Sequence, residues 1–166
     1  VMSARLVLEN EEVVRVAITL QNLQEETLKE ASSHLCWNHF RHAPVAKEVW
    51  ARTGEKWTDF TQYVSRGPYR HFYFGQSPGT QAGPDITTRA LFTEYEMGNQ
   101  TFGVFIAAPS AKSLMSNVNW PCTDINIDFG SLGPGESATR LLFIGMGLHN
   151  RDYWLDVAEK LLQLPE

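Results

Sequence analysis

Hydrophobic and polar residues alternate with a period of two along much of the chain, a pattern typical of strands buried on one face. The clearest example is the segment EVVRVAITLQN at 12–22. Its apolar side carries Val14, Val16, Ile18 and Leu20. The segment RLVLE precedes it, and the intervening Asn10-Glu11 is a turn signal. These segments predict two successive strands.

Shorter strands of the same kind follow along the rest of the chain. They are predicted in SHLCWNH, KWTDF, YRHFYF, SLMSN, TDINID and ATRLLFIGMG. The stretch TTRALFTEYEMGNQTFGVFIAAP predicts a β-hairpin, because Gly98-Asn99 is a turn signal between two apolar arms. The polar segment NLQEETLKEA at 22–31 is predicted as a loop that leads into the next strand. The Gly- and Pro-rich segment at 76–84 is predicted as a long surface loop.

One helix is predicted, in the segment NRDYWLDVAEKLLQL. Its apolar residues recur with helical spacing, at Trp154, Val157, Ala158, Leu161 and Leu162. Asn150 is a suitable N-cap, and the charges of Asp152 and Lys160 suit the two ends of the helix dipole. We therefore expect a helix over 150–163 whose apolar side packs against the edge of a sheet.

About nine or ten short strands and one helix indicate a mainly β fold, an antiparallel β-sandwich with one C-terminal α-helix. The 166 residues suffice for one domain with a substantial core and are few for two. We expect a single β-sandwich domain over 1–166. Its abrupt start in strand-like sequence suggests a domain excised from a longer chain, or a chain already trimmed. The sequence lacks the strand–helix rhythm of parallel α/β enzymes.

Two stretches carry a resemblance to known families. VVRVAITLQNLQEETL and the later FGSLGPGESATRLLFI resemble bacterial immunoglobulin-like and sugar-mutarotase-like β-sandwich domains. In those domains a strand ends in Asn before a polar turn, and a late Pro-Gly-Glu turn leads into the closing strand. The middle of the chain, from HLCWNHFRHAP to NVNWPCTDINIDFG, is similar to uncharacterised bacterial proteins of the same build. The resemblance implies the fold, and no catalytic motif of the mutarotase-like enzymes is carried over to a residue of this chain.

The composition narrows the classes of partner. The chain has 14 Lys and Arg against 19 Asp and Glu, a net charge of −5, and this argues against nucleic acid, because a phosphate backbone calls for a basic surface. A hydrophobic fraction of 43% and a charged fraction of 20% describe a soluble globular protein. No apolar stretch is long enough to span a bilayer, and the N-terminal segment lacks the features of a signal peptide. The sequence leaves the compartment and the oligomeric state open.

The segment SHLCWNHFRHAP contains a cluster of histidines and a cysteine: His34, Cys36, His39 and His42. The histidines are candidate catalytic or metal-binding residues, because imidazole serves both roles near neutral pH. On a strand His34 and Cys36 share one side, whereas His39 reaches that side only through a bulge or turn. The spacing matches no zinc signature, and the alternative is a core cysteine beside polar histidines at a strand end. Cys36 and Cys122 could form a disulfide, but a domain of this size does not need one, and we favour two buried thiols.

The segment CTDINID places three oxygen-bearing side chains on one side of a strand: Asp124, Asn126 and Asp128. Two carboxylates and an amide are suitable ligands for a divalent cation, and the carboxylates are suitable acid/base groups. Asp124 is thus a candidate catalytic residue and Asp128 a candidate metal ligand. Asp124 and Asn126 are also candidate ligand-binding residues. The alternative is a solvated strand face opposite an apolar one, which the same alternation predicts.

Tryptophan and tyrosine are frequent in the middle of the chain. Candidate ligand-binding residues in this region are Trp50, Trp57, Trp120 and Asn119. Exposed indole rings form flat platforms for pyranose rings, and polar side chains provide hydrogen bonds around them. The alternative is that the tryptophans fill the core. Trp120, between Asn119 and Pro121, is difficult to bury as a regular strand residue.

These features are compatible with three functions, of which we favour the first. It is a non-catalytic β-sandwich module that binds a carbohydrate or a similar small polar ligand through loop-end aromatic and polar side chains. The second is an acid/base or metal-assisted enzyme acting on a sugar-like substrate, whose site combines one of the three clustered histidines with Asp124 or Asp128. The third is a structural or interaction domain of a larger protein. Apart from a divalent metal in the second case, no cofactor is expected.

Overall fold

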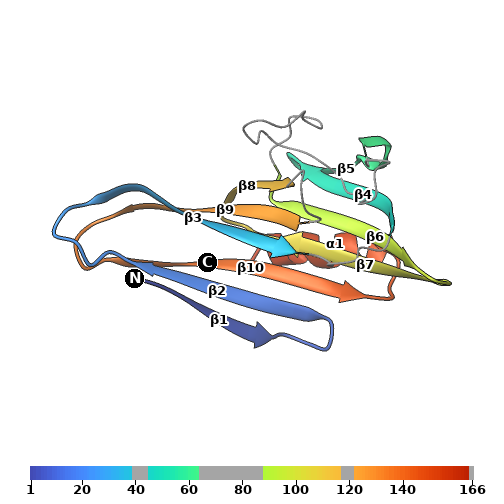
Figure 1. Cartoon of the computed structure of the whole chain (residues 1–166), viewed down its shortest axis with the longest axis horizontal. Coiled ribbons are helices and arrows are strands. Elements are labelled where there is room, and N and C mark those ends of the chain that lie inside the picture. Colours follow the sequence, from blue (N-terminus) through green and yellow to red (C-terminus); the bar gives the residue numbers. More distant parts are fainter. Residues whose placement is uncertain (39–44, 64–87, 117–121, 165–166) are drawn as a thin grey trace.

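A computed structural model describes residues 1–38, 45–63, 88–116 and 122–164 (Figure 1). The described part is mainly β, with ten strands, one short 3-10 turn and one C-terminal helix. The elements are β1 Met2–Leu8, β2 Val13–Gln21, β3 Leu28–Asn38, β4 Val45–Thr53, β5 Lys56–Asp59, η1 Thr61–Tyr63, β6 Ala90–Met97, β7 Gln100–Ala107, β8 Ala111–Ser116, β9 Cys122–Leu132, β10 Ser137–Gly147 and α1 Arg151–Leu162.

Two antiparallel sheets form the sandwich (Figure 1). The larger sheet has seven strands in the order β1-β2-β10-β7-β6-β4-β5, and the smaller has three in the order β3-β9-β8. Consecutive strands pair as hairpins in β1–β2, β4–β5 and β6–β7, whereas the β2–β3 and β9–β10 connections cross between the sheets. The predicted antiparallel β-sandwich with one C-terminal helix is confirmed.

The main core lies between the two sheets and follows from the alternation in the sequence. Its buried side chains include Ile18 on β2, Leu91 on β6, Ile106 on β7 and Ile125 on β9. Side chains that alternate with these residues along the strands face solvent or α1. The edge strands β1 and β5 of the larger sheet, both of which the structure describes in full, contribute no side chain to this core. Burial of one such aliphatic side chain is worth about 1.5–3 kcal/mol, so this core is the main force that joins the sheets.

α1 forms a third layer over the outer face of the larger sheet, against β6, β7 and β10 (Figure 1). Trp154 of α1 is fully buried, 0% exposed, and packs with Phe92 and Phe105. Gly103 and Gly147 make room for the indole, since a Cβ atom on Gly103 would lie 2.5 Å from Trp154 Cδ1. The prediction that the helix packs on a sheet edge is wrong, because these glycines leave a hollow in the middle of the sheet.

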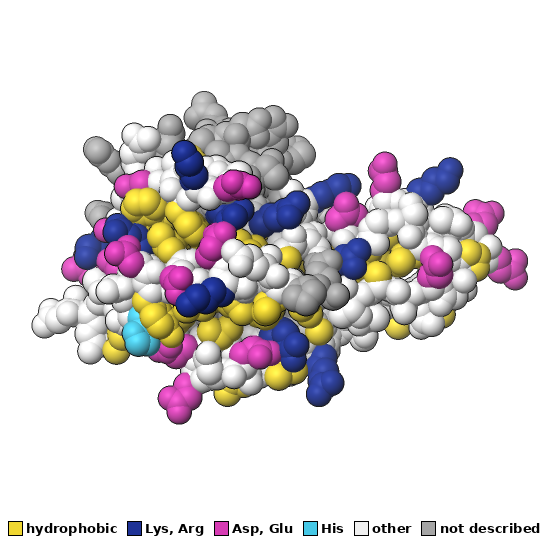
Figure 2. All heavy atoms as spheres, turned by 180° about the vertical axis from the view of Figure 1, so that it is seen from behind, with side chains coloured by type: hydrophobic (Ala, Val, Ile, Leu, Met, Phe, Trp, Pro, Cys, Tyr) yellow, Lys and Arg dark blue, Asp and Glu magenta, His cyan; other side chains and the backbone are white. Residues whose placement is uncertain are grey.

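The ends of α1 agree with the capping signals in the sequence. The Asn150 side chain accepts a hydrogen bond from the Tyr153 backbone N–H at 3.0 Å, and Asp152 and Lys160 lie in the first and last turns. On the face of the molecule opposite to that of Figure 1, acidic and basic side chains are interspersed with hydrophobic ones (Figure 2). No helix in the described part of the chain is long and apolar enough to cross a membrane.

Asn22 joins two connections at one end of the molecule, β2–β3 and β9–β10 (Figure 1). Its side-chain nitrogen donates to the carbonyls of Glu26, Leu132 and Gly133 at 2.8, 3.0 and 3.1 Å. Its backbone N–H donates to the Glu136 carbonyl at 2.9 Å, and the residue is 1% exposed. The Asn at a strand end and the Pro-Gly-Glu turn, which carry the resemblance described above, therefore meet in space.

Two elements differ from the sequence prediction. The alternation in VAKEVWART is interrupted between Ala46 and Glu48, where the pairing of β4 with β6 is irregular, so β4 lacks the sequence period of a strand and was missed. β3 begins at Leu28, inside the segment predicted as a loop, and is irregular where Glu30 has a φ of 52°. The predicted strand YRHFYF and the predicted loop at 76–84 lie outside the described residues.

Candidate functional site

The solvent-facing side of the smaller sheet carries a row of polar side chains, which we call the outer strip: His34, Cys36, Asp124, Asn126 and Asp128. β3 and β9 pair so that His34 lies opposite Asn126 and Cys36 lies opposite Asp124. The intervening residues of β9 are buried in the main core. Asp124, Asn126 and Asp128 thus lie on one side of β9, as the alternation predicts, and their roles remain predictions.

His34 and Asp124 are predicted site residues that the sheet brings together from two strands. His34 Nε2 lies 3.6 Å from Asp124 Oδ1, and the side chains are 59% and 14% exposed. This distance exceeds the roughly 2.7–3.2 Å of a direct hydrogen bond, and the contact is an ion pair only when the imidazole is protonated. The imidazole is therefore accessible to a ligand, beside a carboxylate that is largely buried.

The predicted metal site is only partly within the described chain. His39 and His42 lie outside it, and among the described residues no three His, Cys, Asp or Glu side chains lie close enough to hold a metal ion. The prediction of a buried thiol is wrong for Cys36, which is exposed and unpaired, because its side of β3 faces solvent. The side chain of Cys122 is outside the described part. Metal binding by the predicted histidines and Asp128 remains a prediction.

A pocket of about 460 Å³ adjoins the Asp128 end of the outer strip, and we call it the junction pocket. Its lining includes Arg89, Ser110, Lys112, Asp128, Gly130 and Arg140. The pocket lies where β9 continues past the end of its pairing with β8 and where β10 begins before its pairing with β7. β8 pairs with β9 only as far as Ile127, and β7 pairs with β10 only from Phe143. The turn between β7 and β8 borders the space that remains.

Three cations and one carboxylate line the junction pocket. Arg140 Nε donates to the Asp128 carbonyl at 2.9 Å, and its Cζ lies 6.0 Å from the centre of the Phe129 ring. Lys112 Nζ lies 3.9 Å from Asp128 Oδ2. Asp128 Oδ1 accepts a hydrogen bond from the Gly130 N–H at 2.9 Å. The pocket therefore combines excess positive charge with one anionic acceptor.

The basic residues of this pocket are not among the site residues that the sequence predicts. Arg89, Lys112 and Arg140 are far apart along the chain, and only strand pairing brings them together. One signal was present. Arg140 lies between Ala138 and Leu142, on the side of β10 that packs against the main core. An arginine in the inward row of an otherwise apolar strand indicates a position where the core ends and a polar site begins.

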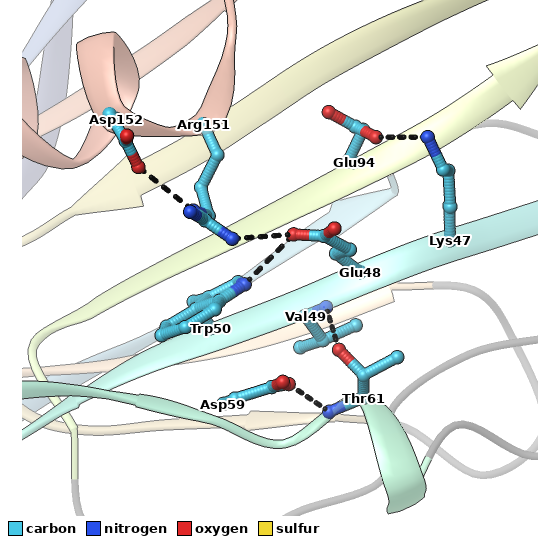
Figure 3. A network of polar contacts seen from close by, with 9 residues as sticks. All are labelled: Lys47, Glu48, Val49, Trp50, Asp59, Thr61, Glu94, Arg151 and Asp152. Carbon is cyan, nitrogen blue, oxygen red and sulfur yellow. Dashed lines mark hydrogen bonds and ion pairs between the residues drawn. The ribbon is translucent and has the colours of Figure 1, made fainter.

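Trp50, a predicted ligand-binding residue, is half-buried on β4 beside α1. Its Nε1 donates to Glu48 Oε2 at 3.2 Å, and Arg151 Cζ lies 4.6 Å from its ring centre (Figure 3). Arg151 also bonds Asp152 at 3.0 Å and Glu48 at 3.2 Å. The hydrogen bond to Asp152, and then the charges of both carboxylates, raise the pKa of Arg151. Arg151 thus covers a ring surface that a pyranose would need.

Trp57 on β5 also packs against the residues beneath α1. Next to it in the pairing, Arg52 makes two hydrogen bonds to Glu159 of α1, from Nε to Oε2 at 2.7 Å and from Nη2 to Oε1 at 2.8 Å. These bonds lower the pKa of Glu159 and raise that of Arg52. Trp120 and Asn119, the other two residues predicted to form an aromatic and polar binding surface, lie outside the described residues, and their role remains a prediction.

Comparisons with known proteins give structural neighbours and no family. No protein-family model and no curated protein sequence matches the chain. A proposed aldose 1-epimerase from Escherichia coli K12 has a TM-score of 0.43 and 13% identity, over 89% of this chain and 60% of that one. The Slr1438 protein from Synechocystis has a TM-score of 0.41 and 8% identity, over 89% and 55%. A TPR-domain containing protein from Parabacteroides distasonis has a TM-score of 0.39 and 12% identity, over 92% and 31%.

This chain therefore spans between 31% and 60% of the length of these structures. At these scores the neighbours assign no activity and no site residue to the chain.

Proposed function

We propose that this protein is a β-sandwich module that binds a carbohydrate or a similar polar ligand, without catalysis, at the junction pocket and the outer strip. The observation that carries the proposal is the mixed lining of the junction pocket, with donors on Arg89 and Lys112 and an acceptor on Asp128. Sugar hydroxyl groups both donate and accept, so their binding sites need partners of both kinds. The volume of about 460 Å³ lies within the range of roughly 300–1,000 Å³ typical of small-ligand sites.

The outer strip would extend the site along β9. Asp124 and Asp128 are about 13 Å apart along an extended strand, at about 3.3 Å per residue. Asn126 lies between them on the same side. This length suits a short oligosaccharide better than a single sugar. Because the side chains stand on paired strands, little ordering is needed when a ligand binds.

The number and spacing of the carboxylates support a site that binds a glycan and argue against one that hydrolyses it. Among the described residues that line the junction pocket, Asp128 is the acidic one, and its Oδ1 already accepts a bond from the Gly130 N–H. Glycoside hydrolysis commonly uses two carboxyl groups about 5–9.5 Å apart. Asp124, at about 13 Å along the strand, is farther from Asp128 than that.

A glycan array with two matched variants tests the proposal. Asp128→Asn removes the pocket carboxylate, and Asp156→Asn makes the same change on α1, where Asp156 pairs with Lys160 at 2.6 Å. We expect the wild type to bind a defined set of glycans, Asp128→Asn to bind them about tenfold more weakly, and Asp156→Asn to bind them normally. A wild type that binds no glycan, or an Asp128→Asn variant with unchanged affinity, contradicts the proposal.

One observation favours the second function, an enzyme acting on a sugar-like substrate. His34 Nε2 lies 3.6 Å from Asp124 Oδ1, and an imidazole beside a carboxylate is a common acid/base arrangement. Bound glycans are therefore also followed by NMR for chemical conversion, and the protein is analysed for metal by plasma mass spectrometry. Two results would support the enzyme and contradict the non-catalytic module. One is glycan turnover that is lost in His34→Ala, and the other is stoichiometric metal that is lost in His39→Ala and His42→Ala.

A further inference from the structure

We infer that the junction pocket is an oxyanion-binding subsite and that the ligand carries a carboxylate or sulfate group, an inference that rests on the proposed function. The chain as a whole is acidic, with 19 Asp and Glu against 14 Lys and Arg. The described lining of the pocket has the opposite balance, with Arg89, Lys112 and Arg140 against Asp128. A local excess of positive charge attracts an anionic ligand even when the protein is acidic overall.

Arg89 is the cation that the fold uses least. Its side chain is exposed and makes no hydrogen bond or ion pair with any residue that the structure describes. Its backbone is nevertheless fixed, because its carbonyl accepts a hydrogen bond from the Ala108 N–H at 2.8 Å. Arg52, by contrast, spends two donors on Glu159. A guanidinium that lines a pocket and has no carboxylate partner among the described residues is suited to bidentate binding of an external oxyanion.

Ser110 contributes a hydroxyl group that lacks a partner. Its Oγ is buried and makes no hydrogen bond within the described structure. Ser110 lines the junction pocket, and its carbonyl is held by the Asp128 N–H at 3.2 Å. Buried hydroxyl groups in proteins nearly always have a hydrogen-bond partner. A ligand oxygen in the pocket would supply it once the Ser110 side chain rotates toward the pocket, because its Oγ is shielded from solvent where it now lies.

Lys112 and Asp128 define how an acidic sugar would be oriented. Their separation of 3.9 Å is at the outer limit of an ion pair, and the ammonium group carries three donors. Asp128 repels an anion but accepts from a hydroxyl group. The acidic group of the ligand would therefore lie toward Arg89, and a neighbouring hydroxyl group toward Asp128.

The experiment uses glycans in matched pairs that differ only in a carboxylate or a sulfate group, together with inorganic sulfate in an NMR titration. Arg89→Gln removes a charge that the described fold does not use, and Lys112→Gln is a second pocket variant. Lys56→Gln, an exposed position on β5, is the control. We expect acidic glycans to bind at least about tenfold more tightly than their neutral partners. Arg89→Gln should weaken acidic glycans and sulfate by about tenfold, and Lys56→Gln should weaken neither.

The outcomes separate this inference from the proposed function. Equal binding of neutral and acidic glycans, unchanged in Arg89→Gln and Lys112→Gln, overturns the oxyanion subsite and leaves the carbohydrate module standing. Sulfate binding that depends on Arg89, without binding of any glycan, supports the subsite and overturns the carbohydrate ligand. If Arg89→Gln and Lys112→Gln bind sulfate as the wild type does, and no glycan binds, both the oxyanion subsite and the carbohydrate module are overturned. Thermal unfolding of each variant checks that the fold is intact.

Discussion

Charged residues on the two outer faces of the sandwich are paired at different distances. On the larger sheet, which α1 covers, Arg52 bonds Glu159 at 2.7 and 2.8 Å. On the smaller sheet the outer strip faces solvent, and there the His34–Asp124 and Lys112–Asp128 contacts span 3.6 and 3.9 Å. The covered face has short pairs with good geometry, whereas the open face has long ones.

The difference separates residues that hold the structure from residues that are available to a ligand. A carboxylate bonded at two points by one guanidinium has little capacity left for a third partner. Side chains in long pairs can exchange partners at a low energetic cost. We therefore expect substitutions beneath α1 to lower stability without changing binding, and substitutions on the open face to do the opposite.

Trp154→Ala is expected to have the largest effect on the covered face. The indole is fully buried and fills the hollow left by Gly103 and Gly147. Its loss should lower the free energy of unfolding by about 3–5 kcal/mol, measured by urea denaturation. Tyr153→Ala, at an exposed neighbouring position, is the control and should cost less than about 1 kcal/mol. Equal effects of the two changes would show that α1 is not part of the core.

Glu159→Gln is expected to have an intermediate effect, with a defined pH dependence. The bonds from Arg52 lower the pKa of Glu159 below its ordinary value of 4.5. Their stabilisation is therefore complete above that value and is lost as the pH falls through the lower pKa of the folded state. The variant should lose about 1 kcal/mol or less near neutral pH, because both side chains are partly exposed.

This dependence is measured by urea denaturation of the wild type and Glu159→Gln at a series of pH values, from neutral to below the ordinary carboxyl pKa of 4.5. The difference between the two proteins should shrink as the solution becomes acidic. A difference that stays constant with pH would assign the loss to packing of the Glu159 side chain and not to its charge.

His34→Ala is expected to have the smallest effect on stability. Its side chain is 59% exposed, and its contact with Asp124 is long. The free energy of unfolding should change by less than about 0.5 kcal/mol, and thermal unfolding is a sufficient measurement. A loss above about 1 kcal/mol would place this pair with the structural ones and remove the distinction between the faces.

The sequence predicted the strands whose alternation is regular, because the period of side chains reports directly on which face is buried. β4 was missed where irregular pairing between Ala46 and Glu48 breaks that period. The position of α1 in the middle of the sheet depends on Gly103 matching Trp154, a fit between distant residues that no local pattern contains.

The same limit applies to the candidate site, whose residues are predictable along one strand but not between distant segments. Alternation along one strand was enough to place Asp124, Asn126 and Asp128 on one side of β9. The cations of the junction pocket come from separate strands and loops, so their proximity follows from the lengths of β7 to β10 and not from spacing in the sequence.

The hydrogen bonds of Asn22 also have a consequence for folding during translation. They join positions 110 residues apart, and a ribosome adds roughly 5–20 residues per second. The β9–β10 connection is thus synthesised roughly 5–20 s after β2. During that interval β2 has β1 as its hairpin partner, but β10, its other neighbour in the sheet, does not yet exist. The apolar side and one backbone edge of the nascent β2 then stay exposed, and exposed apolar surface with an unpaired strand edge favours aggregation until β10 has been made.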